Sequence, residues 1–216
     1  MLSSPEHEEI TLSIETAIAG GSIALIKGSK LAAGTAGGGS VSRAEDLLLG
    51  IDEILKPTLI DRSDLSSIMV SIGPGSFTGL RIGLATAMGL STALGIPCRG
   101  ISLFDAIAHG SETSLTIVVP LGKSDLCFRF YDKGTARGDF VVGDLGALES
   151  FIKDNRPEQI AHHPDVDPFR LVEVGSAKTT LIDLGPNLAE YIGKYAGLHA
   201  GTGSLEPIYV RNPRFA

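Results

Sequence analysis

The sequence contains no tryptophan, and aromatic residues make up only 6% of its 216 positions. No apolar run approaches the ~20 residues that a membrane-spanning helix needs, so we expect no membrane span. The only two cysteines, Cys98 and Cys127, lie far apart, which predicts free thiols rather than a disulfide framework. Basic residues are fewer than acidic ones, and the formal net charge of -7 disfavours a chain that itself binds nucleic acid tightly.

The remaining composition is typical of a globular protein. Hydrophobic residues make up 43% of the chain and charged residues 20%, and the length suffices for a sizeable core in one or two small domains. The N-terminal MLSSPEHEE is acidic and no apolar signal core follows it. We therefore expect a cytoplasmic protein without a secretory signal.

Hydrophobic periodicity predicts an α/β protein with two halves of similar organisation. In the first half we expect strands at 11–16, 22–26, 30–35 and 68–72, and helices at 42–55, 78–94 and 103–109. In the second half we expect strands at 115–119, 126–131, 138–142, 159–162 and 171–174, and helices at 145–153 and 187–198. The C-terminal PIYVRNPRFA is predicted to be an edge strand, and the domain boundary is placed near residues 110–113.

The most informative segment is SIGPGSFTGLRIGLATAMG, residues 71–89. Gly73 and Gly75 suit a tight turn after a buried strand, and Ser76 suits the start of a helix. Small residues such as Gly79 and Gly83 would let another backbone approach that helix closely. The residues alone leave two interpretations open, an anion-binding turn or a helix-to-helix interface.

Candidate catalytic groups are few. Glu15 and Thr16, at the end of the first strand, occupy a place where a carboxylate can hold a metal-bound phosphate. The glycine turn is not a Walker A loop, because no Lys-Ser/Thr pair follows it, and Ser76 lacks the G-x-S-x-G spacing of a hydrolase nucleophile. The five histidines form no HExxH or HxxxH pair, so no metal site is expected.

The segment GPGSFTGLRIGLATAMGLSTALGIPCRGISLFDAIA resembles the hallmark segment of the TsaB (YeaZ) family over its whole length. Weaker likeness lies in the opening strand with Glu15 and Thr16, in LLLGIDEIL, and in the C-terminal PIYVRNPRFA. The resemblance implies two ribonuclease-H-like lobes of the actin/Hsp70 (ASKHA) type, each a mixed sheet with flanking helices. Residues 1–110 would form the N-terminal lobe with the partner-binding helices, and residues 111–216 a degenerate C-terminal lobe.

The function implied by the resemblance is that of a non-catalytic scaffold subunit. TsaB-like proteins pair with TsaD, the transferase that attaches threonylcarbamoyl to adenosine 37 of tRNA, and TsaE joins the pair. The resemblance further implies a homodimer when TsaD is absent, only indirect contact with tRNA, and no cofactor, except ATP or ADP at a shared interface. An ATP-dependent phosphotransferase or ATPase of the same superfamily is the alternative, and a glycoprotease-like peptidase is a more remote one.

The resemblance also implies two sets of site residues. The residues expected at the partner interface are Arg43, Leu47, Gly79, Arg81, Gly83 and Ala87. The residues expected at a vestigial nucleotide or anion site are Glu15, Thr16, Gly73, Gly75 and Ser76. Glu15 stands where the family usually has aspartate, and Arg43 stands where its helix usually begins with histidine.

Overall fold

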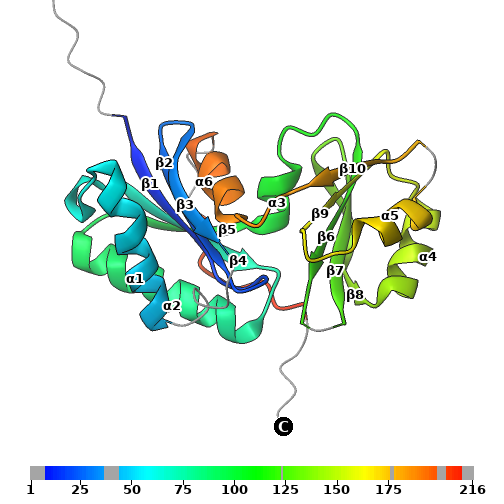
Figure 1. The fold of residues 1–216 in the computed structure, drawn as a ribbon, viewed down its shortest axis with the longest axis horizontal. Coiled ribbons are helices and arrows are strands. Elements are labelled where there is room, and N and C mark those ends of the chain that lie inside the picture. Colours follow the sequence, from blue (N-terminus) through cyan, green and yellow to red (C-terminus); the bar gives the residue numbers. More distant parts are fainter. Residues whose placement is uncertain (1–7, 37–43, 123, 176–177, 199–202, 211–216) are drawn as a thin grey trace, which may run out of the picture.

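The computed structural model describes residues 8–36, 44–122, 124–175, 178–198 and 203–210. Two five-stranded sheets stand side by side, each with helices packed against it (Figure 1). None of the helices in these ranges combines the length and apolar character needed to cross a bilayer. The α/β class expected from the sequence is confirmed.

The first sheet has the strand order β3-β2-β1-β4-β5. Its strands are β1 (Ile10–Glu15), β2 (Ser22–Lys27), β3 (Lys30–Ala36), β4 (Ser67–Gly73) and β5 (Cys98–Ser102). The first three strands are antiparallel neighbours, whereas β4 and β5 run parallel to β1. This order follows from the chain, because short turns join β1 to β2 to β3 and a crossover helix is needed before each parallel strand.

Helices cover both faces of this sheet. The long helices α1 (Ala44–Leu55) and α2 (Phe77–Leu94) lie on one face, while α3 (Leu103–Ala108) and α6 (Ala189–Leu198) lie on the other (Figure 1). Successive side chains of β1 point to opposite faces of the sheet, as strand geometry requires. Leu12 and Ile14 pack into the core under α1 and α2, whereas Ser13 faces α6.

The second sheet repeats the same plan with the order β10-β9-β6-β7-β8. Its strands are β6 (Ser114–Pro120), β7 (Leu126–Asp132), β8 (Thr135–Gly143), β9 (Gln159–His162) and β10 (Thr180–Asp183). Here again three antiparallel strands are followed by two parallel ones. The helices α4 (Leu145–Asn155) and α5 (Pro168–Val174) pack on its outer face, over a core that includes Phe128 and Leu148.

The chain returns to the first lobe after β10. Residues 111–216 were expected to form the second lobe, but α6 packs on β1, β2 and β4 of the first sheet. Residues 203–210, which we call the C-terminal strap, also return there, and the Ile208 amide donates to the Ile72 carbonyl at 2.7 Å. The first sheet would otherwise expose part of one apolar face, and α6 covers it with Ala189 against Ala24 and Ile26.

Two short elements differ from the prediction. Residues 171–174 belong to helix α5 rather than to a strand, because Pro168 begins the helix and the Asp167 side chain accepts the Phe169 amide at 3.0 Å. The fifth strand of the second sheet is instead β10, which begins nine residues after Leu171. The described part of the C-terminal segment is extended but is not a strand, and residues 211–216 lie outside the described residues.

Helix α2 lies unusually close to the end of β1. A Cβ atom at Gly79 would lie 2.9 Å from the Ala17 Cα and closer still to the Thr16 carbonyl oxygen. A Cβ atom at Gly83 would overlap the Thr16 hydroxyl. By contrast, Gly89 on the same helix is exposed and has nothing within 4 Å of the corresponding position. The first two glycines therefore permit the packing of α2 on the sheet.

This contrast predicts opposite effects of two alanine substitutions in one helix. Gly79→Ala should lower the free energy of unfolding by about 1–3 kcal/mol, because backbone atoms surround the new methyl group. Gly89→Ala should raise it by roughly 0.5–1 kcal/mol, because alanine has the higher helix propensity and the methyl group meets no atom. Urea denaturation of the two variants measures both values. Equal effects at the two positions would contradict the close approach of α2 to β1.

Candidate functional site

An open cleft of about 1260 Å³ lies between the two lobes. It is lined by the β1–β2 turn and the start of α2 from the first lobe. The β6–β7 turn contributes from the second lobe, and Tyr209 and Val210 of the C-terminal strap complete the lining. The predicted anion-binding residues Thr16, Gly75 and Ser76 all lie here. The structure therefore brings most of that predicted set to one place.

Glu15 stabilises the β1–β2 turn beside the cleft. The side chain is 1% exposed, and it is absent from the cleft lining. Its Oε1 accepts the Ala17 amide at 2.6 Å and its Oε2 accepts the Ile18 amide at 3.4 Å. Burial raises the pKa of this carboxyl to about 7, against the lowering effect of the two amides. Glu15 thus holds the β1–β2 turn, and both oxygens already have partners.

The polar groups of the glycine turn are also engaged within the protein. The Thr16 hydroxyl donates to the Gly79 carbonyl at 2.7 Å, and the Ser76 amide donates to the Ala17 carbonyl at 2.9 Å. The Ser76 hydroxyl accepts the Gly79 amide at 3.4 Å, as a helix cap does. These bonds tie the turn to the end of β1. Two of the amides that a phosphate cradle would use are therefore already satisfied.

Glycine at positions 73 and 75 is explained by close packing. Gly73 has φ = +115°, and a Cβ atom there would lie 2.8 Å from the Ile208 carbonyl oxygen. At Gly75 a Cβ atom would overlap the Ala17 methyl group. The backbone conformation and the strap thus account for Gly73, and the contact with Ala17 accounts for Gly75, without a ligand.

Two acidic side chains lie in the lining of the cleft. Among its described lining residues there are two carboxylates, Asp125 and Asp165, and no lysine or arginine. Asp165 Oδ2 lies 3.8 Å from Nδ1 of the buried His163, and desolvation lowers the pKa of this imidazole. In the described part of the chain no group of three His, Cys, Asp or Glu side chains is placed to hold a metal ion.

The second candidate site is the outer side of α1 and α2. Both helices cover the same face of the first sheet (Figure 1). Large apolar side chains on them are exposed. Leu48 is 42% exposed, Leu49 63% and Met88 50%. Ala85 and Gly89 lie beside Met88 on the exposed side of α2. We call these five residues the outer α1–α2 face.

Most of the predicted interface residues are not on this face. Gly79 and Gly83 are buried against Thr16, while Leu47 and Ala87 are both 0% exposed within the core of the first lobe. Arg81 is exposed, and its guanidinium lies 4.0 Å from the centre of the Phe77 ring. Arg43 lies outside the described residues. The structure thus places Leu47, Gly79, Gly83 and Ala87 on the inner sides of α1 and α2.

Comparisons with known proteins point to one family. Residues 40–143 match the family model described as TsaD: tRNA N6-adenosine threonylcarbamoyltransferase. The tRNA threonylcarbamoyladenosine biosynthesis protein TsaB of Escherichia coli is 34% identical over 61 residues, which are 28% of this chain and 26% of that protein. The structure of YeaZ from Pseudomonas aeruginosa superposes with a TM-score of 0.64 and 19% identity, over 94% of this chain and 100% of that one.

These matches support the placement of this chain in the TsaB/YeaZ family. The fold also agrees with that of kinases of the expected superfamily. The polyphosphate/ATP-glucomannokinase of Arthrobacter sp. strain KM has a TM-score of 0.55 and 13% identity over 87% of this chain and 97% of that one. The two-lobe architecture of the actin/Hsp70 type is thus confirmed.

The sequence likeness is confined to part of the chain. The first curated relatives are uncharacterised mycobacterial proteins that are 35–40% identical over 78–80 residues, and the matched segments cover 22–36% of those proteins. The same segments cover 36–37% of this chain. The family match spans α1 and α2, the helices that carry the outer face.

The burial of Glu15 predicts a specific dependence of stability on pH. Its pKa is about 7 in the folded state and 4.5 for an unperturbed carboxyl, so between these values the folded state holds a proton that the unfolded state has lost. The contribution of Glu15 is thus full below pH 4.5 and is lost as the pH rises through 7. Over that window we expect a decline in the free energy of unfolding of up to about 3 kcal/mol.

Glu15→Gln should remove this decline, because glutamine does not titrate. Urea denaturation at pH 5, 6, 7 and 8 should show the variant gaining stability relative to the unmodified chain as the pH rises. Glu53→Gln, on the exposed side of α1, is the matched control and should keep the slope of the unmodified chain. If the free energy of unfolding changed with pH in parallel for Glu15→Gln and the unmodified chain, the raised pKa of Glu15 would be refuted.

Proposed function

We propose that this protein is a non-catalytic scaffold subunit for the synthesis of threonylcarbamoyladenosine in tRNA, and that it pairs with a TsaD homologue. The observation that carries the proposal is the outer α1–α2 face, which exposes Leu48, Leu49 and Met88 on adjacent helices. Large apolar side chains gathered on one side of a soluble lobe are typical of a protein contact site. The segment that builds this face also lies within the match to the TsaD family model.

The small residues of α2 suit helix-to-helix contact on this face. Ala85 and Gly89 flank Met88, so a partner helix can approach the α2 backbone closely on either side of the Met88 side chain. Two helices of the partner would then form a four-helix contact with α1 and α2. A second copy of the chain presents the same surface, which supports a homodimer when the TsaD homologue is absent.

The cleft supports a role without catalysis. A phosphotransferase of this superfamily would need groups that hold phosphates and a metal ion. Here Glu15 binds two backbone amides instead, through both of its carboxylate oxygens. In this proposal any ATP or ADP binds at an interface shared with the partner. A TsaE homologue would join the pair, tRNA would contact the complex through TsaD, and the protein would act in the cytoplasm.

The proposal predicts which substitution breaks the pair. Leu49→Asp should weaken binding to the TsaD homologue of the same organism by roughly thirtyfold or more, because a charge would be buried at the centre of an apolar contact. Phe169→Asp is the control, because Phe169 is 80% exposed on α5 of the second lobe. Isothermal titration calorimetry measures both affinities, and circular dichroism checks that each variant is folded. Equal affinities for the two variants would reject the outer α1–α2 face as the contact site.

The function itself is tested by reconstitution. Purified TsaD and TsaE homologues, threonylcarbamoyl-adenylate and unmodified tRNA should form the modified nucleoside only when this chain is added. Mass spectrometry of digested tRNA measures the product. Glu15→Gln and Ser76→Ala should support full modification, because neither residue acts in the chemistry. Loss of product with these two variants, both folded, would instead indicate a catalytic cleft.

A further inference from the structure

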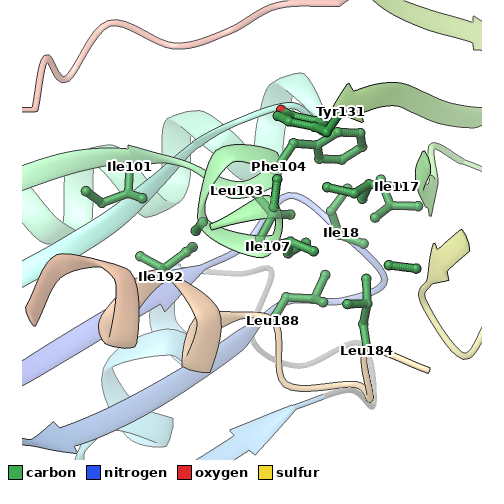
Figure 2. Close-up of a cluster of buried hydrophobic side chains, with 14 of the residues drawn as sticks. Ile18, Ile101, Leu103, Phe104, Ile107, Ile117, Tyr131, Leu184, Leu188 and Ile192 are labelled. Atoms are coloured by element: carbon green, nitrogen blue, oxygen red, sulfur yellow. The ribbon is translucent and has the colours of Figure 1, made fainter. Parts of the chain in front are cut away.

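One buried apolar core belongs to both lobes. Figure 2 shows its side chains gathered around α3, with Leu188 and Ile192 of α6 on one side and Ile117 and Tyr131 of the second lobe on the other. From the first lobe the core includes Ile18, Met69, Ile101, Leu103, Phe104 and Ile107, and from the second lobe Leu115, Ile117, Val119, Cys127, Tyr131 and Leu184. Phe104 and Ile117 are each 0% exposed. The boundary between the sheets is therefore filled with closely packed side chains.

A polar contact fixes the position of the lobes within this core. The Tyr131 hydroxyl on β7 donates to the Asp105 carboxylate on α3 at 2.7 Å. Tyr131 is 0% exposed, and its burial together with Asp105 raises the pKa of its hydroxyl, so the donated proton is retained at physiological pH. A hydrogen bond to a carboxylate is short and strong, and it tolerates little displacement of either partner.

One aromatic pair crosses the same boundary. The ring of Phe104 on α3 meets the ring of Phe140 on β8 edge to face, with centroids 5.3 Å apart. The Arg129 guanidinium lies over the outer side of Phe140, 4.6 Å from its ring centre. A rotation of one lobe against the other would therefore separate the Phe104–Phe140 pair as well as the Tyr131–Asp105 bond.

The chain also crosses between the lobes more than once. It passes from α3 to β6, and it returns from β10 to α6 through Leu184 and Leu188, which are both buried in the shared core. The C-terminal strap then runs beside β4 and ends at the cleft, where Val210 packs against the shared core. A hinge would need loosely packed connections, whereas the return connection from β10 to α6 is held in the core by Leu184 and Leu188.

We infer that the two lobes form one rigid body and that the cleft between them does not close. Motion between domains is the usual expectation unless the contact between them is large and hydrophobic, and here it is a core shared by both sheets. The contacts that hold the lobes together are those of α3 and α6 and the Tyr131–Asp105 hydrogen bond. They give the cleft a constant width, whereas an enzyme that closes on its substrate changes that width. This inference does not depend on the proposed function.

Distance measurements between the lobes test the rigidity. Spin labels are attached to cysteines introduced at the exposed positions Glu53 on α1 and Ser150 on α4, with Cys98 replaced by serine. Pulsed electron resonance should give one narrow distance distribution for the full chain. MgATP, used as the probe of closure, should leave that distribution unchanged. Two populations, or a shift with MgATP, would overturn the inference.

Unfolding followed separately in each lobe tests whether the shared core couples the two lobes. Because the chain has no tryptophan, Phe77→Trp and Phe151→Trp provide one fluorescent reporter in each lobe. Both reporters should show the same urea midpoint, and Tyr131→Phe should lower both midpoints together, with a roughly tenfold smaller folding equilibrium constant. Tyr209→Phe, at the cleft rim, is the control and should change neither. Separate midpoints in the two lobes, or a Tyr131→Phe effect confined to one reporter, would refute a shared rigid core.

Discussion

The close contact between α2 and the end of β1 determines the arrangement of the first lobe. Gly79 and Gly83 bring the helix backbone against Thr16, and the Thr16 hydroxyl donates to the Gly79 carbonyl. The same contact places the start of α2 at the cleft and sets which residues of the helix face the sheet. Because the inward side is settled by these glycines, Ala85, Met88 and Gly89 face solvent. Both candidate sites thus depend on one packing interaction.

The two sites differ in the kind of chemistry that they offer. At the cleft, polar groups satisfy one another, since Glu15 binds the amides of its own turn and Ser76 caps its own helix. At the outer α1–α2 face, Leu48, Leu49 and Met88 remain uncovered in the described chain. A fold like that of the glucomannokinase is here combined with a cleft whose turn is internally hydrogen-bonded and with an apolar outer face. That combination favours association with another protein over chemistry on a nucleotide.

The sequence predicted the elements that carry strong local signals. The paired strands, the helix after the GPGSFTG turn and the two-sheet plan follow from alternation, capping residues and glycine turns. The short segments were less predictable. An apolar run around Leu171 suits a strand or a helix equally, and the Asp167-Pro168 start signal decides between them. The return of α6 to the first sheet has no local signal, because it depends on which apolar surface is left uncovered.

The site residues likewise divide into those that the sequence predicted and those that only the folded structure placed. The sequence by itself determined the strand–turn–helix unit at residues 71–89, the likeness to the TsaB/YeaZ proteins, and the place of Thr16, Gly75 and Ser76 near one another. Only the tertiary structure decided that Gly79 and Gly83 are buried while Met88 is exposed. The physical reason is that α2 is apolar on all sides, so its periodicity does not mark an inner face. The inner face is the one that fits against Thr16, and that fit exists only in the folded lobe.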